Sequence, residues 1–204
     1  IYEPFSFGIV KKCNIAARYV KNDCIIVATD DTIPEKKWDT KILESTDWSE
    51  ELVLNVSDGT ESKDTRVYMV KTVILSKKRY EKLGYILHPD FSHVYCDNFH
   101  SWISHRDSIV LDRKDIMFEH LHPSIGKSEI DEFYLKCNTQ DEYNRGERIF
   151  QKLTRNSLSS KKLDQFVDKF SFEVDPVKKI ILAFVILSHD TNLQEKLVEL
   201  AKTS

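Results

Sequence analysis

Apolar residues recur along the chain in short runs, and these runs predict alternating strands and helices. Cys24-Ile-Ile-Val-Ala-Thr29 is apolar and rich in β-branched residues, which predicts a buried strand that ends at Asp30 and Asp31. Apolar positions at helical spacing predict a helix over 35–45, with Pro34 in its first turn. Further predicted elements are strands at 52–56, 67–75, 108–112 and 115–120, and helices at 76–83 and 97–105. This alternation is typical of an α/β protein.

The chain beyond Pro123 is predicted to be mainly helical. Thr139-Gln-Asp-Glu142 is a capping box that opens an amphipathic helix, and residues 160–170 repeat its apolar pattern. Residues 179–188 form a continuous β-type run, and Thr191-Asn-Leu-Gln194 caps a last helix. These elements predict a helical C-terminal extension that ends in a strand–helix pair.

Composition places the chain among globular proteins. The 204 residues are 41% hydrophobic, which is enough for a packed core and too much for a disordered tail. Thirty basic residues nearly balance 33 acidic ones, and the pI is about 6.2, which argues against nucleic acid as a partner. The longest apolar run, at 180–187, is about half of the roughly 18 residues that a membrane span needs. Because a signal-peptide pattern is also absent, we expect a cytoplasmic protein.

Cysteine and glycine spacing argues against several common sites. The four cysteines form no C-x-x-C pair, so zinc-finger and thioredoxin-like sites are not predicted and the thiols are expected to be reduced. The five glycines form neither G-x-G-x-x-G nor G-x-x-x-x-G-K-[ST], which argues against a Rossmann dinucleotide site and a P-loop. Candidate chemistry therefore rests on carboxylates, histidines and a lysine.

The first candidate is the acidic pair Asp30-Asp31 at the end of a predicted strand. Two carboxylates there offer the hard oxygen ligands that Mg²⁺ or Mn²⁺ prefers. The alternative is that Asp31-Thr32 only caps the helix after Pro34.

The second candidate is the pair His120 and His122. If the strand continues, both side chains lie on one face, where they could ligate a metal or contact a phosphate. The alternative is two ordinary polar histidines near the end of a strand.

Two further side chains suit a reaction with a phosphorylated or sugar substrate. Asp97, at the start of a predicted helix, is either a general base that takes a proton from a sugar hydroxyl or an N-cap. Lys127, beside Gly126, either meets a phosphate or is a surface lysine. Trp38, Trp48 and Trp102 could stack on a sugar or base, but the helical spacing of Trp38 and Trp102 favours core packing for these two.

The order of these motifs resembles that of GT-A-type nucleotide-sugar glycosyltransferases, in particular the inverting enzymes of family 2. The matching stretch runs from about Asn14 to Leu153. Its motifs are Asn14-Ile-Ala-Ala-Arg18, Asp23 to Asp31, Pro34 with Trp38-Asp39, Ile74 to Tyr85, Asp97, Phe118 to Pro123, Gly126-Lys127 and Asp131-x-x-Tyr134. Asn22 stands where the family has a glycine, and Cys96 stands where it has the Glu of a Glu-Asp catalytic motif.

The resemblance implies a GT-A-like mixed sheet flanked by helices, and a metal site that holds a nucleotide-sugar donor. Asp30 and Asp31 would be the acidic motif, with Asp31 bound directly to Mn²⁺ or Mg²⁺ and Asp30 on the donor side. His120 would be a further metal ligand or a diphosphate contact, with His122 as its substitute. Lys127 would contact the diphosphate.

The resemblance also implies the reaction. Asp97 would activate an acceptor hydroxyl, on a glycan or a protein, for in-line attack at the anomeric carbon, with inversion. The departing nucleoside diphosphate is a poor leaving group until a divalent cation neutralises its charge.

One departure from the family concerns the nucleotide-binding strands that normally precede the metal motif. Few residues precede Cys24, and the chain opens on Ile1, whereas Lys178 to Asp190 and the capped helix after it look like such an opening strand. The chain is a piece of a longer protein, a permuted domain, or a domain with an unrelated strand–helix pair. We favour the first account, in which the chain would be inactive alone. Residues 1–155 would then be a partial GT-A-like catalytic domain, 156–176 a helical connector and 177–204 the start of a second domain.

Two other functions stay open. The chain could be a non-catalytic binding or scaffold domain with the transferase fold, which predicts no metal-dependent ligand binding. It could also be a metallohydrolase that uses Asp30, Asp31, His120 and His122, which predicts hydrolysis of a phosphoester without a nucleotide sugar.

Overall fold

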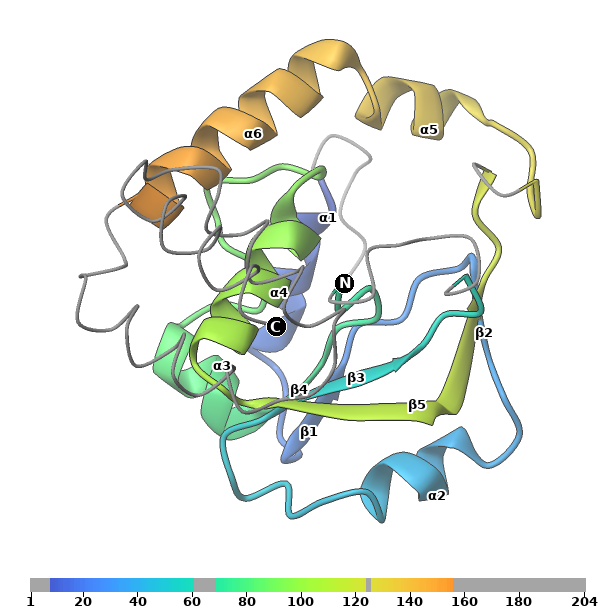
Figure 1. Ribbon diagram of the computed structural model, residues 1–204, viewed down its shortest axis with the longest axis vertical. Coiled ribbons are helices and arrows are strands. Elements are labelled where there is room, and N and C mark those ends of the chain that lie inside the picture. Colours follow the sequence, from blue (N-terminus) through green and yellow to red (C-terminus); the bar gives the residue numbers. More distant parts are fainter. Residues whose placement is uncertain (1–7, 61–68, 124–125, 156–204) are drawn as a thin grey trace, which may run out of the picture. The chain divides into compact units, whose positions relative to one another are not determined.

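The computed structural model describes residues 8–60, 69–123 and 126–155 (Figure 1). The chain divides into two compact units, Ile1–Glu147 and Arg148–Ser204, and the boundary falls inside the last described helix. In chain order the elements are α1 (Ile9–Ala17), β1 (Cys24–Ile26), β2 (Thr32–Pro34), α2 (Trp38–Leu43), β3 (Val53–Ser57), β4 (Ile74–Ser76), α3 (Lys77–Leu83), α4 (Cys96–Arg106), β5 (Val110–His120), α5 (Glu132–Cys137) and α6 (Gln140–Arg155).

The five strands form one mixed sheet in the order β1-β4-β3-β5-β2. β3 and β5 are parallel, whereas the other three neighbouring pairs are antiparallel. Because the carboxyl ends of parallel strands meet at the same edge, the residues that follow Ser57 and those around His120 come together there. The sheet and its helices confirm the mixed α/β class that the sequence predicts.

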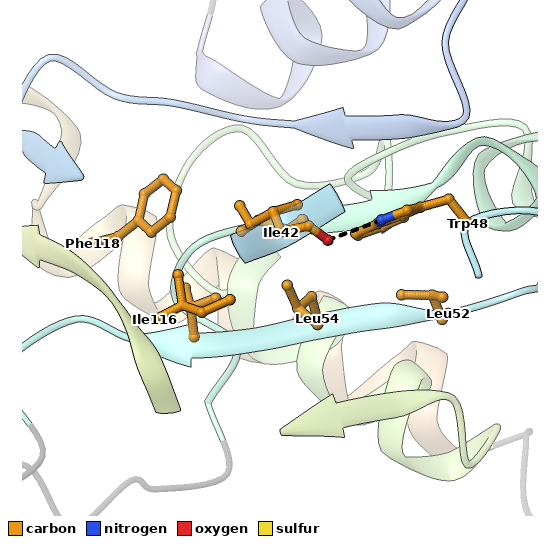
Figure 2. Packing of buried hydrophobic residues seen from close by; sticks show 8 residues of the cluster. Ile42, Trp48, Leu52, Leu54, Ile116 and Phe118 are labelled. Atoms are coloured by element: carbon orange, nitrogen blue, oxygen red, sulfur yellow. Dashed lines mark hydrogen bonds between the residues drawn. The ribbon is translucent and has the colours of Figure 1, made fainter. Parts of the chain in front are cut away.

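One apolar core lies between the sheet and α2. Leu54 and Val56 of β3 face it, as strand alternation requires, while the intervening residues of this fully buried strand face the other way. In Figure 2, Ile42 and Trp48 lie against side chains of the sheet, and the Trp48 indole donates a 3.0 Å hydrogen bond to the Ile42 carbonyl. The cluster consists of Ile42, Trp48, Leu52, Leu54, Val56, Ile74, Ile116 and Phe118. Burial of one such side chain stabilises the fold by roughly 1.5–3 kcal/mol.

The segment between Asp31 and α2 differs from the prediction. Pro34 ends β2 and is not helical, because Glu35 extends the pairing with β5: its N–H donates to the Met117 carbonyl and its carboxylate accepts from the Met117 N–H. The N-cap of α2 is Lys37, at φ 61°, so the helix begins later than predicted. The alternative in which Asp31 and Thr32 cap this helix is therefore wrong.

Strand β5 replaces the two short strands predicted near 108–112 and 115–120. Its pairing with β3 shifts register, from Val56 opposite Arg113 to Ser57 opposite Met117. Such a bulge interrupts the pairing within one continuous strand, near the gap between the two predicted strands. The ammonium group of Lys114 donates to the side-chain oxygen of Asn55 and to the Val56 carbonyl at this point.

The helix ends show which local signals are reliable. Ser76 caps α3 by accepting from the Arg79 N–H, and Gly84, at φ 75°, closes it directly after Leu83, where the predicted helix ends. In contrast, the prediction that Asp97 is the N-cap of α4 is wrong. The helix begins at Cys96, its N-cap is Tyr95 at φ 68°, and Asp97 lies in its first turn. In Figure 1, α4 and α2 lie on opposite sides of the sheet.

The structure also tests the predictions for the start of α6, for two tryptophans and for the remaining strands and helices. The Thr139 hydroxyl accepts the Glu142 N–H at the start of α6, which confirms this half of the capping box. Trp102 is buried, and Trp38 packs edge-to-face on Phe118. Both therefore pack in the core, which is the role that their helical spacing favoured. Where the strand predicted at 67–75 is described, from residue 69 on, only its end is a strand, as part of β4 (Ile74–Ser76). The elements predicted at 160–170, 179–188 and 191–200 lie outside the described residues.

Candidate functional site

The candidate site lies where β3 and β5 end. The His120 N–H donates a 3.1 Å hydrogen bond to the carbonyl of Asp58, the first residue after β3. The next N–H, of Leu121, donates to the Asp31 carbonyl at 2.7 Å. Asp31 directly precedes β2, whose Thr32 pairs with His120. Backbone hydrogen bonds therefore join three segments that are distant in sequence, around Asp31, Asp58 and His120, at one edge of the sheet.

Asp31 and His120 meet through their side chains. Nε2 of His120 lies 3.0 Å from Oδ2 of Asp31, and both side chains are partly exposed, at 28% and 39%. Burial alone would raise the pKa of Asp31, but hydrogen bonds from Thr29 and His120 outweigh it and lower the pKa below its ordinary value. The carboxylate is therefore ionised at neutral pH and reachable by a ligand.

His122 extends this pair although β5 ends at His120. The two imidazole rings lie edge-to-face with their centroids 5.0 Å apart, and the ring of Tyr134 lies 5.6 Å from that of His122. Asp131 caps α5 by accepting the Tyr134 N–H at 2.6 Å. The spacing of Asp131 and Tyr134 thus has a local structural role, which also holds Tyr134 beside His122.

Lys127 lies beside the same edge. Its N–H donates to the His122 carbonyl at 3.4 Å, and its ammonium group lies 2.7 Å from Oε1 of Glu119. A Cβ placed on Gly59 would be 3.9 Å from this ammonium group. Gly59 has φ +74°, so this close turn suits glycine. Lys127 therefore flanks the turn after β3.

The predictions missed a buried polar cluster in that turn. Asp58 is only 3% exposed, and its carboxylate accepts from the N–H and the hydroxyl of Thr60 and lies 2.8 Å from the Lys71 ammonium group. Burial would raise the pKa of Asp58, but Lys71 and Thr60 lower it. The available signal was an aspartate two residues after the strand predicted at 52–56, which is close to the pattern that singled out Asp30 and Asp31.

Asp97 belongs to a different element, α4. Its Oδ1 accepts the N–H of Asn98 at 2.9 Å, and its carbonyl accepts from the Ser101 hydroxyl at 2.7 Å. The Ser101 hydroxyl oxygen in turn accepts the Val70 N–H at 2.9 Å. The residue after Val70 is Lys71, which contacts Asp58, so hydrogen-bonded neighbours connect α4 with the His120 edge.

The loop that leads to Asp97 is held by the first part of α6. Arg145 donates to the Ser92 hydroxyl and to the Asp90 carbonyl. Gly146 is buried here, and a Cβ on it would lie 2.9 Å from Cδ2 of Tyr95 and 3.0 Å from the Val94 carbonyl. This close approach explains a glycine inside a helix.

The donor chemistry at the edge fits a divalent cation. An ionised carboxylate and an imidazole are ordinary ligands for Mn²⁺, and such ions commonly take further oxygens from substrate phosphates and water. Asp30 is exposed beside Asp31 and could contribute from the same turn. Within the described ranges, no three His, Cys, Asp or Glu side chains form a ready-made metal group.

Comparisons of the chain with protein-family models, with curated proteins and with solved structures found no match. None of the helices in the described part of the chain has the length and apolar character that a membrane crossing requires.

Proposed function

We propose that the chain is a metal-dependent glycosyltransferase of the GT-A type, or a part of one, that transfers a sugar from a nucleotide-sugar donor to an acceptor hydroxyl with inversion. The main support is the 3.0 Å contact between Asp31 and His120, which are 89 positions apart. These residues come from two separate motifs of the family resemblance. A chance match of short motifs gives no reason for the two to meet.

The residues at the edge have complementary roles in this proposal. Asp31, His120 and His122 would hold Mn²⁺ or Mg²⁺, and Asp30 and Lys127 would bind the donor. When bound, the cation supplies positive charge that stabilises the diphosphate leaving group. The lowered pKa of Asp31 keeps its carboxylate charged for this task. Lys127 is held by Glu119, and exchange of this partner for a phosphate oxygen needs only a side-chain movement.

Asp97 would act on the acceptor side. The first turn of α4 is anchored by the Ser101 hydroxyl, which donates to the Asp97 carbonyl and accepts the Val70 N–H. A positioned carboxylate can take the proton of an attacking hydroxyl and accelerate the reaction by typically 10²–10⁴-fold. The second oxygen of Asp97 offers an acceptor for this proton beside the one that receives the Asn98 N–H.

The test is a thermal-shift titration of the full chain with a panel of nucleoside diphosphates, each with Mn²⁺ and with EDTA. We expect stabilisation by at least one diphosphate in Mn²⁺ only, and its loss in Asp31→Asn. A response to no diphosphate in any condition would contradict the proposal and favour the scaffold alternative. Hydrolysis of a simple phosphoester without a nucleotide sugar would favour the metallohydrolase.

A further inference from the structure

A largely buried ion pair lies in the turn after β3, next to the candidate site. Lys71 and Asp58 are 2.8 Å apart, with side chains only 19% and 5% exposed. Thr60 accepts from the Lys71 ammonium group and donates to the carboxylate, so the three side chains form a closed set of bonds. Transfer of two charges out of water is costly, and such a pair persists where its bonds are well formed.

This ion pair fixes the turn that orients His120. The carboxylate of Asp58 is held by Lys71 and Thr60, and the carbonyl of the same residue accepts the His120 N–H. The turn contains Gly59 at φ +74°, a residue with little conformational restraint of its own. Release of the carboxylate would therefore free the carbonyl that holds His120.

The same lysine is joined to the acceptor side. Val70 donates its N–H to the Ser101 hydroxyl, which also bonds to the Asp97 carbonyl. Val70 is fully buried, and Lys71 directly follows it in the chain. The hydrogen bond that anchors Val70 therefore also restricts the backbone of Lys71. Lys71 is thus the residue at which the connection to α4 and the connection to β5 meet.

We infer that Lys71 and Asp58 are positioning residues that set the distance between the metal-side His120 and the acceptor-side Asp97. The inference rests on the proposed function, since it assigns these two residues their roles. Neither Lys71 nor Asp58 needs to touch the substrate. Partners that orient a metal ligand typically change metal affinity or activity by 10–100-fold when they are removed.

The deciding experiment is amide hydrogen exchange of the full chain, followed by NMR, in the native protein, Lys71→Met and Lys71→Arg. In Lys71→Met we expect the amides of His120 and Val70 to exchange about 10-fold faster or more. The Asp58 carbonyl that accepts the His120 N–H loses its fixed turn, and Val70 loses the anchor on the residue that follows it. The Val53 amide, which donates to Ile109 at the other end of β3, is the internal control. Lys71→Arg, which keeps the charge, should restore slow exchange.

A second variant guards against loss of the fold. Lys71→Met leaves a buried carboxylate without its cation, whereas the double variant Lys71→Met/Asp58→Asn leaves no unpaired charge. Both should show fast exchange at His120. Lys78→Met removes the same charge from an exposed pair with Glu50 and should leave all three amides unchanged.

Mn²⁺ affinity, measured by titration with the metal alone and detected by electron paramagnetic resonance, supplies the functional readout. We expect it to fall about 10-fold in the double variant and to be unchanged in Lys78→Met. If the native protein binds no Mn²⁺, the proposed function fails, while the exchange rates still decide the positioning of His120. Unchanged His120 exchange in both Lys71→Met variants would overturn the inference. Unchanged Mn²⁺ affinity where the native protein binds the metal would also overturn it.

Discussion

A cation lies at each end of the parallel β3–β5 pair, Arg79 before the strands and Lys71 after them, and the two differ in burial and in surroundings. Before the strands, Arg79 is fully buried and its Nη1 donates to Glu51 at 2.6 Å and to Asp107 at 2.8 Å. After the strands, Lys71 is partly exposed and contacts Asp58 next to the candidate site. Ligands of open α/β sheets bind beyond the carboxyl ends of strands. The first cluster is therefore expected to stabilise the fold, whereas the second lies beside the site of the proposed function.

The Arg79 cluster contains buried polar atoms without hydrogen-bond partners, an energetic cost that is not found at Lys71 and Asp58. Among the described residues, Nε and Nη2 of Arg79 and Nε2 of the neighbouring His100 are buried without a hydrogen-bond partner. Buried polar atoms of this kind each cost about 1–3 kcal/mol. The fold tolerates this cost because one arginine joins the segments before β3 and before β5 to α3.

The largest expected effect is on stability, in Arg79→Met. The change leaves Glu51 and Asp107 without their buried cation, and we expect the free energy of unfolding to fall by about 3–5 kcal/mol. Urea unfolding followed by circular dichroism measures it. Lys82→Met removes the exposed partner of Glu51 and should cost less than about 1 kcal/mol. A similar loss in both variants would show that Arg79 has no special role.

The next effect is on ligand binding, in Asp31→Asn. Loss of the charged ligand should weaken metal-dependent nucleotide binding by about 100-fold or more, beyond the range for residues that act indirectly. Isothermal titration calorimetry with the diphosphate identified by thermal shift measures the change. Asp141→Asn, an exposed position on α6 with the same change in net charge, is the control. Equal weakening in the two variants would indicate an effect of net charge alone.

A third effect is pH dependence at the Arg79 cluster. Burial lowers the pKa of His100 to about 4, and the charge of Arg79 adds to this effect. Since the ordinary pKa is 6.5, the unfolded chain binds the proton first as the pH falls. The stability that neutral His100 contributes is complete above pH 6.5 and is lost as the pH falls toward 4.

From pH 7 to 4.5 this loss should be about 2–3 kcal/mol. Urea unfolding at both pH values, in the native protein and in His100→Gln, isolates it, because carboxylates contribute equally to the two proteins. The same pH dependence in both proteins would show that another group titrates.

The smallest effect is expected in Gly146→Ala. Alanine improves helix propensity by up to about 1 kcal/mol, but its Cβ would meet Tyr95 and the Val94 carbonyl. We expect a net destabilisation of about 1 kcal/mol, because overpacking typically costs 1–3 kcal/mol. Thermal unfolding measures it, and Glu147→Ala, exposed on the same helix, is the comparison. A stabilised Gly146→Ala protein would show that α6 does not press on the loop before Asp97.

Local patterns predicted those parts of the fold that depend on a few neighbouring residues. The predicted helix over 76–83 matches α3 closely, because the Ser76 hydroxyl acceptor and the left-handed Gly84 act within one helical turn. The same reasoning was wrong at Asp97 and Pro34. At Asp97 the backbone of Tyr95 adopts a positive φ, and at Pro34 pairing with β5 takes precedence over the helix.

The sequence by itself determined the α/β alternation, the bounds of α3, the start of α6 and the residue types that suit a metal and a phosphate. Only the tertiary structure decided which of these meet: Asp31 with His120, and His122 with Tyr134. It also revealed Asp58 and Lys71, which no motif singled out. The physical reason is range. Capping and periodicity act over one or two turns, whereas the site is assembled by the register of strands that are distant in sequence.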